Sequence, residues 1–402
     1  MNSVGIDISK GRSTIAVMRP FGEVAISPFE VRHTDSELSE LARRLKSLNG
    51  ETRVVMEATG NYHAPVAKQL HDAGLYVSVV NAKLVHGYGN NDLRRVKTDR
   101  KDAIKLANYG LDRWLTLPRY IPEENTRLLL KNCYRQYRQY SKVQTVLKNN
   151  LISLLDMTFP NANRLFNSPA RADGSEKWVD FVAEFWHCEC VSERPLKSFV
   201  NKYWRWCRKH GYNFSEEKAH AIYDEASGHI GVMPKSETTK LLVEQAVSQL
   251  SATSAALAVL KQEMQSLSSQ LPEYPVVMDM RGVGDSLGPQ LMAELGDVTR
   301  FTHRNAITAF AGVDPGADQS GTHEAKSTRV SKSGPPELRR ALFLVMDCLL
   351  KTQPQDDPVY RFMDKKRAEG KPYLVYMTAG ANKFLRIYYG RVKEYLASLE
   401  GN

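Results

Sequence analysis

The chain has 402 residues, of which 42% are hydrophobic and 25% charged, so it has ordinary globular composition and room for two or three domains. No apolar run approaches the roughly 20 residues of a membrane span, and the N-terminus lacks the pattern of a secretory signal. The net charge of +10 favours a polyanionic partner, most simply nucleic acid, over a membrane.

The first elements along the chain are three strands and a helix. Apolar patterning predicts strands over residues 3–8, 13–18 and about 23–31, joined by short glycine-containing turns. A helix is expected to begin near Thr34, because Thr34 and Glu37 form a capping box and leucines follow at helical spacing.

Strands and helices alternate in the next stretch. Residues 53–57 indicate a buried strand that ends in a carboxylate, 62–73 a helix, and 75–80 another buried strand, after which two short helices follow. This alternation predicts a mixed sheet covered on both faces. The element order is that of an RNase H-like fold, and we place this α/β domain at residues 1–118.

Two long helices are predicted next, with a further segment of the chain between them. Heptad-spaced apolar residues predict one helix over about 122–155 and another over about 236–271. We therefore assign residues 119–157 and 236–271 to coiled-coil helices. The two helices could pair with each other or with a second protomer, and the pattern allows both.

Residues 158–235, the aromatic-rich insertion, hold four of the five tryptophans. Trp204, Arg205 and Trp206 lie beside further cations, so stacking on unpaired bases is one interpretation. A small aromatic core is the favoured one, because tryptophan is usually buried. The role of this segment stays open.

The five cysteines are odd in number and scattered, which argues against a disulfide framework and indicates a reducing cytoplasm. One group within the insertion has the residue types of a zinc site, namely Cys188, Cys190, Cys207 and His210. The spacing of these residues fits no common zinc template, so free buried thiols are the favoured interpretation.

Residues 272–402 predict a mainly helical C-terminal domain that contains a polar, basic loop at 320–334. Several cations there and upstream suit phosphate contacts, with a solvated face as the alternative. The candidates for nucleic-acid binding are Arg94, Arg95, Lys97, Lys101, Arg135, Arg138, Arg329, Lys332, Arg339 and Arg340. The tyrosines interspersed with Arg135 and Arg138 suit RNA stacking and helix-core packing about equally. They are Tyr134, Tyr137 and Tyr140.

Four acids fall at positions that this fold brings together. Asp7 lies in the first strand, Glu57 ends the fourth, and Asp99 and Asp102 share a helix face. If the first and fourth strands are neighbours, Asp7 and Glu57 lie side by side, and a helix over that edge brings the other pair within reach. Such carboxylates repel one another unless a hard cation such as Mg²⁺ sits among them. Two Mg²⁺ ions would suit phosphoryl transfer.

Three motifs, G-I-D-I-S-K, M-E-A-T-G and K-T-D-R-K-D-A, resemble the D-E-D-D signature of the insertion sequence one-hundred-ten family of transposases, which are related to the Piv DNA invertase. The C-terminal stretch R-G-V-G…A-E-L-G-D…A-F-A-G-V-D-P…S-G…S-K-S-G is similar to that family's transposase domain. The resemblance covers residues 1–157 and 236–395 and leaves out the aromatic segment 160–233.

The resemblance implies that Asp7, Glu57, Asp99 and Asp102 are the catalytic, metal-binding acids of a RuvC-like nuclease domain. It also implies that Ser320 is a nucleophile that forms a covalent phosphoserine link to DNA. Without the family, Ser327, Ser331 and Ser333 in the same loop could not be ranked against it. Serine attack would conserve the phosphodiester energy for rejoining.

Members of this family resemble RNA-guided recombinases, in which a structured non-coding bridge RNA pairs with donor and target double-stranded DNA. The implied protein is a cytoplasmic bacterial enzyme, associated with the nucleoid when active, and a homo-oligomer of two or four subunits. The alternative function is a Mg²⁺-dependent, Holliday-junction-type endonuclease without a covalent intermediate. A third is a non-catalytic scaffold for nucleic acid.

Overall fold

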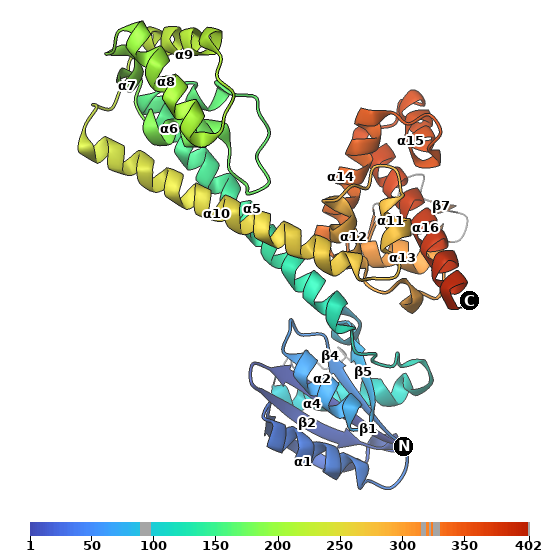
Figure 1. The fold of residues 1–402 in the computed structure, drawn as a ribbon. Helices are drawn as coiled ribbons and strands as arrows, with labels where there is room; N and C mark the ends of the chain where they lie inside the picture. The colour runs from blue at the N-terminus through green and yellow to red at the C-terminus, as the bar shows by residue number, and fades with distance from the viewer. Residues whose placement is uncertain (89–97, 315–318, 321–322, 325–329, 401–402) are drawn as a thin grey trace. The chain divides into compact units, whose positions relative to one another are not determined.

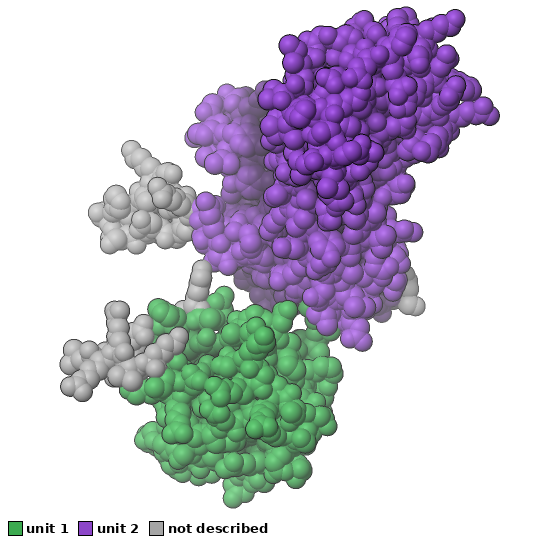
Figure 2. All heavy atoms as spheres, turned by 90° about the vertical axis from the view of Figure 1, so that its left-hand side faces the viewer, with its two compact units in different colours: residues 1–123 green, residues 124–402 purple. Residues whose placement is uncertain are grey.

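The structure is a computed structural model that describes residues 1–88, 98–314, 319–320, 323–324 and 330–400. The chain divides into two compact units, Met1–Glu123 and Glu124–Asn402 (Figures 1 and 2). The finer four-part division drawn from the sequence stays a prediction. Within the described ranges, no helix combines the length and the hydropathy that a bilayer crossing requires.

The first unit is built on a five-stranded sheet whose strand order is β3-β2-β1-β4-β5 (Figure 1). The central strand β1 is antiparallel to β2 and parallel to β4. This is the RNase H-like arrangement expected from the sequence, so that fold class is confirmed. The strands are β1 (Asn2–Ser9), β2 (Arg12–Met18), β3 (Val24–Arg32), β4 (Thr52–Glu57) and β5 (Tyr76–Val80).

Successive residues of each strand point to opposite faces of the sheet, so each face carries apolar side chains, and helices cover both faces. Val4, Ile6 and Val54 on one face join the core beneath α1 and α2. Val55 and Leu106 belong to a separate core beneath α4 on the other face. The helices of this unit are α1 (Asp35–Lys46), α2 (His63–Asp72), α3 (Ala82–His86) and α4 (Asp99–Asp112), with 3₁₀ turns η1 (Pro20–Gly22) and η2 (Trp114–Thr116).

At the start of α1, the threonine of the predicted capping box caps the helix, while its glutamate bonds to a residue before the cap. The Thr34 hydroxyl accepts the Glu37 N–H at 3.4 Å, as expected of an N-cap. The Glu37 carboxylate accepts the N–H of Arg32 at 2.7 Å, two residues before the cap. The helix therefore begins where the sequence indicates, while its glutamate ties down the end of β3.

Gly5 sets how closely α4 approaches β1. A Cβ atom at this position would overlap the backbone carbonyl oxygen of Ala103 and the backbone nitrogen of Ala107. At the other end of the contact, a Cβ at Gly110 would overlap the Ser3 hydroxyl. The helix thus lies against the strand backbone, with glycine at each contact point.

In the second unit, α5 (Asn125–Thr158) and α10 (Glu237–Ser269) form an antiparallel helical hairpin (Figure 1). Gln144 donates to the Ser254 hydroxyl at 2.9 Å, and Arg127 at the start of α5 meets Glu273 just after α10. The two predicted long helices therefore pair with each other within one chain, which answers a question that the sequence left open.

The aromatic-rich insertion folds at the far end of the hairpin, around a core that it shares with the adjacent ends of α5 and α10. Phe181, Phe199, Tyr203 and Trp206 are completely or almost completely buried there, which confirms the predicted aromatic core. The elements of the insertion are η3 (Ala162–Arg164), α6 (Lys177–Glu184), α7 (Glu189–Ser192), α8 (Leu196–His210) and α9 (Glu216–Gly228).

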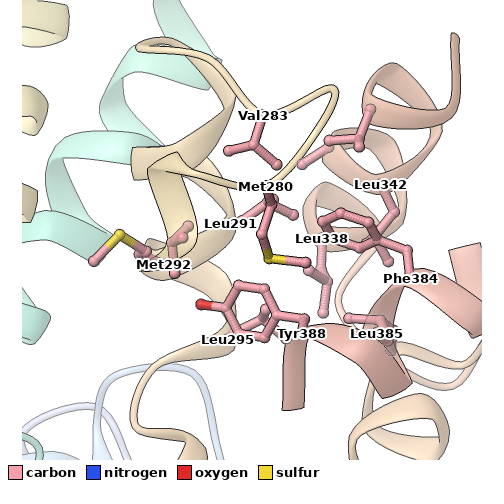
Figure 3. Close-up of a cluster of buried hydrophobic side chains, with 14 of the residues drawn as sticks. Met280, Val283, Leu291, Met292, Leu295, Leu338, Leu342, Phe384, Leu385 and Tyr388 are labelled. Atoms are coloured by element: carbon pink, nitrogen blue, oxygen red, sulfur yellow. The ribbon is translucent and has the colours of Figure 1, made fainter. Parts of the chain in front are cut away.

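The C-terminal part is mainly helical and packs around a large apolar core, in which Met280, Leu291, Leu342 and Phe384 lie together (Figure 3). Its elements are α11 (Tyr274–Met278), α12 (Leu287–Leu295), η4 (Val298–Arg300), α13 (Arg304–Ala311), β6 (Gln319–Ser320), β7 (His323–Glu324), α14 (Pro336–Thr352), α15 (Pro358–Ala368) and α16 (Tyr373–Glu400).

We expect Gly5→Ala to lower the free energy of unfolding by about 3 kcal/mol, because the added methyl group would push α4 away from β1. Thermal unfolding and hydrogen exchange of the α4 amides measure the effect. Gly390→Ala is the control, since a Cβ there meets nothing within 4 Å and glycine disfavours a helix. Equal stability of Gly5→Ala and the parent chain would show that α4 is not held this closely.

The Arg127–Glu273 ion pair is buried, with side-chain exposures of 7% and 1%. We expect Arg127→Met to destabilise the second unit by about 3–5 kcal/mol, because it leaves a buried carboxylate without a partner. The double variant R127M/E273M should recover most of that loss. Urea unfolding of the four chains of this cycle measures the coupling, and additive effects of the two changes would contradict it.

Candidate functional site

Asp7 and Glu57 occupy equivalent positions on neighbouring strands. The parallel register pairs Gly5 with Val55 and Ile6 with Met56, so Asp7 and Glu57 follow as the next positions along β1 and β4. Gly5 and Val55 face α4, and side chains on a strand alternate with a period of two. Both acids therefore lie on the α4 face of the sheet, at the carboxyl ends of their strands, and both are half-buried.

The first turn of α4 lies at the same edge. Gly110 lies over Ser3, while Ala103 and Ala107 lie over Gly5, so α4 runs antiparallel to β1. Two residues along a strand cover about 7 Å, which nearly matches the length of about 7.5 Å that five residues cover along a helix. Continuing this register past Gly5 by two strand residues places the stretch from Asp99 to Asp102 over Asp7.

Local structure explains why α4 begins there. The hydroxyl of Thr98 caps the helix by accepting the N–H of Lys101 at 3.3 Å. Asp99 and Asp102 then fall in the first turn, where the helix dipole favours negative charge. Asp99 is exposed and Asp102 is half-buried. The helix start thus tolerates two acids at an edge that already holds two more.

The four acids share an edge without being closed around an ion. Across the part of the chain that the structure describes, no three His, Cys, Asp or Glu side chains are grouped tightly enough to hold a metal. The donors themselves are all carboxylates, which is the ligand type that Mg²⁺ prefers. The acids therefore suit Mg²⁺ in chemistry and in backbone placement, and their side chains would have to turn toward one another to bind it.

Ser320 belongs to the second unit, apart in sequence from the acids. Its backbone lies in β6, paired across a two-stranded ribbon with His323 of β7. Of the rival serines, Ser327 lies outside the described residues. Ser331 and Ser333 are exposed, and their hydroxyl oxygens are 2.9 Å apart.

The residues expected to bind nucleic acid fall into three groups. Arg94, Arg95, Lys97 and Arg329 lie outside the described residues. Lys101, Lys332 and Arg340 are exposed and accessible to a phosphate. The remaining three have partners within the protein, and these are Arg135, Arg138 and Arg339.

The internal partners of those three arginines are specific. Arg138 is buried against the carboxylate of Glu337 at 2.6 Å, and Arg339 donates to the carbonyl of Gly334 at 2.6 Å. Arg135 lies 3.5 Å from the carboxylate of Glu294. Arg138 thus has the surroundings of a structural ion pair.

The tyrosines beside these arginines pack into the protein. Tyr134 is fully buried in the C-terminal core, and Tyr137 packs against the same core. Burial raises the pKa of the Tyr134 hydroxyl well above its ordinary value. These two side chains contribute to core packing and are not placed for stacking on RNA bases.

The proposed zinc ligands do not converge in the described residues. The imidazole of His210 stacks on Trp206 and Tyr212, while Cys207 is buried beside Tyr203. Burial raises the pKa of the Cys190 and Cys207 thiols, as is usual for unligated thiols in apolar surroundings. The three cysteines are free thiols, of which Cys188 and Cys207 are buried and Cys190 is half-buried.

The sequence analysis missed the role of Gly5, the residue that seats α4 beside the acids. A signal was present, because an isolated glycine inside a strand often marks close approach of another backbone. Nothing in the sequence said which helix would approach, since that depends on the order of the strands.

Two family models match the chain. A model of DEDD transposases of IS110 matches residues 4–160 and includes all four acids. A second model, described as transposase of the IS116/IS110/IS902 family, matches residues 274–361 and includes Ser320. Together the two matches cover more than half of the chain.

Individual relatives are more distant. The pilin gene-inverting proteins of Moraxella bovis and Moraxella lacunata are each 21% identical over 341 residues, which is 85% of this chain and 80% of theirs. Thermus thermophilus RuvC, alone and in complex with a Holliday junction substrate, matches 30% of this chain and 100% or 99% of its own. Those two matches have identities of 16% and 13% and TM-scores of 0.22 and 0.23, so the fold assignment rests on the strand order instead. On the strength of the two family models, the chain belongs to the IS110 family of transposases, enzymes that act on DNA.

Proposed function

We propose that this transposase cuts and rejoins DNA by Mg²⁺-assisted attack of Ser320 on a phosphate, through a covalent phosphoserine intermediate. A structured guide RNA selects the donor and target duplexes by base pairing. The observation that carries the proposal is the shared edge of Asp7, Glu57, Asp99 and Asp102, set by the β1–β4 register and by the seating of α4 on Gly5.

The four acids would hold the metal, two from the strand ends and two from the first turn of α4. When bound, Mg²⁺ supplies positive charge that neutralises the phosphate and favours ionisation of the attacking hydroxyl. The carboxylates alone would repel both one another and a DNA phosphate. Lys101, exposed on the same first turn, adds a cation for the neighbouring backbone of DNA.

The hydroxyl of Ser320 would attack the scissile phosphorus and lose its proton, which balances the proton that the departing sugar oxygen takes up. A phosphorus–oxygen bond to the serine forms, and the bond to one sugar oxygen breaks, leaving that sugar with a free hydroxyl. Attack by the hydroxyl of another DNA end reverses the step and frees the serine. No phosphodiester is lost to water, so no external energy source is needed for rejoining.

Guidance by RNA accounts for the charge and for the way sequence is read. The chain carries an excess of ten positive charges, and its sequence has no recognisable helix-turn-helix or zinc-finger reader. Delegating sequence recognition to base pairing leaves the protein to hold backbones. Exchange between two duplexes requires several cuts, so the active form is a homo-oligomer.

A second function is a structure-selective, Mg²⁺-dependent endonuclease in which water replaces the serine. It is favoured by the fact that all four acids lie in one compact unit, while Ser320 lies in the other. Its products would be free ends that never rejoin.

We expect Asp7→Asn and Asp102→Asn each to weaken Mn²⁺ binding by at least about tenfold and to abolish DNA cleavage, because each removes a carboxylate ligand. Titration followed by electron paramagnetic resonance measures Mn²⁺ without relying on activity. Glu40→Gln is the matched control, since Glu40 lies in α1 on the opposite face of the sheet. Unchanged Mn²⁺ affinity in both aspartate variants would place the metal elsewhere.

We expect Ser320→Ala to bind DNA with unchanged affinity but to form no covalent adduct and no recombinants. The measurement is a denaturing gel of protein incubated with end-labelled DNA. Ser331→Ala and Ser333→Ala should still form the adduct. An adduct in the Ser320→Ala lane would assign the nucleophile to another residue, and cut ends without any adduct in the parent chain would favour the endonuclease.

A further inference from the structure

One face of α8, in the aromatic-rich insertion, is lined with cations. Helix α8 buries Phe199, Tyr203 and Trp206 on its inner side. The outer side carries a line of exposed side chains at intervals of three or four residues, which places them on one face. These are Lys197, Asn201, Arg205 and Arg208, preceded by the exposed Arg194 just before the helix. Over its length within α8 this line extends about 16 Å.

The same face holds an open pocket of about 620 Å³, lined among others by Arg194, Lys197, Lys202 and Arg205. No acidic side chain lines it. Lys202 is paired with Glu184 at 3.3 Å. By contrast, Arg194, Lys197 and Arg205 form no ion pair with any residue in the described ranges. Arg194 and Lys202 also line a neighbouring pocket that contains acidic side chains, whereas Lys197 and Arg205 do not. Clustered like charges that lack ion-pair partners raise the local potential and attract a polyanion.

Trp204 borders this line of cations. Its side chain is 43% exposed, whereas Trp178, Trp186 and Trp206 in the same insertion are at most 8% exposed. The guanidinium carbon of Arg208 lies 5.6 Å from the Trp204 ring centroid. An exposed indole beside cations is the combination on which unpaired bases stack while their phosphates are neutralised.

We propose that this face of α8, defined by Arg194, Lys197, Trp204, Arg205 and Arg208, binds an unpaired segment of RNA. A DNA duplex keeps its bases stacked inside and would leave Trp204 without a partner. Ser198 and Asn201, which also line the pocket, offer neutral hydrogen-bonding groups suited to the ribose 2′-hydroxyl.

This assignment rests on the RNA-binding part of the proposed function and gives that RNA a binding site on the protein. The α8 face lies between the two family-model matches, which end at residue 160 and resume at 274. It is therefore a feature of this chain that neither match describes. Here the insertion would hold a loop of the RNA by charge and stacking.

The test uses the full chain and a fluorescent 20-nucleotide oligouridylate, with an oligothymidylate of equal length and a 20-base-pair DNA duplex as comparisons. We expect K197E/R205E to weaken RNA binding at least about tenfold at physiological salt and to lower the salt slope by about 1.4. The double variant R43E/K261E, with the same change in net charge on exposed residues elsewhere, is the matched control.

We expect Trp204→Ala to weaken RNA binding about fivefold or more, and Trp204→Phe to retain most of the affinity, because phenylalanine still stacks. Melting curves verify that each variant is folded. Equal RNA affinity in K197E/R205E and its control would overturn the proposal, as would equal losses for oligothymidylate or duplex DNA. These measurements need no cleavage of DNA, so RNA binding at α8 can be found even if the serine mechanism is wrong. Equally, the serine mechanism can hold even if α8 binds no RNA.

Discussion

The close contact between α4 and β1 at Gly5 is the constraint on which the candidate site depends. The acids of β1 and β4 are brought side by side by strand register alone. The acids of α4 reach the same edge only because the helix lies against the strand backbone, where any Cβ would collide with Ala103. A backbone-level fit of this kind leaves little room for the helix to shift. It also explains how two polar first-turn residues can approach a sheet edge whose neighbouring positions are apolar.

The chemistry proposed for this chain is divided between two compact units. One unit holds the four candidate metal-binding acids, and the other holds Ser320 on a short ribbon between α13 and α14. The second unit is organised by the α5–α10 hairpin, whose base is fixed by the buried Arg127–Glu273 pair. If Ser320 is the nucleophile, catalysis would need both units at one phosphate. A hydrolytic nuclease has no such need.

The sequence predicted the fold of the first unit well, because strand and helix periodicities there are unambiguous. Side-chain surroundings were less predictable. Tyr134 and Arg138 share a helix with exposed residues, and only the partners supplied by α14 decide that they are buried. The pairing of α5 with α10 was equally open, since a heptad pattern marks a face without naming the partner.

The line of cations on α8 illustrates the same limit. Trp204 and Trp206 are two residues apart in one basic stretch, and composition treats them alike. Helical geometry separates them by about 200°, so Trp206 enters the core while Trp204 stays exposed. Sequence could predict an aromatic core, but choosing which ring remains available for a ligand required the structure.

The most direct test of the central claim is to locate the metal by the damage it causes. Fe²⁺ replaces Mg²⁺ at oxygen sites, and with ascorbate and peroxide it cuts the polypeptide beside the bound ion. Our account predicts cuts clustered near residues 7, 57 and 99–102, suppressed by excess Mg²⁺. Cuts confined to other segments, or cuts at only one of these three places, would contradict a shared metal site.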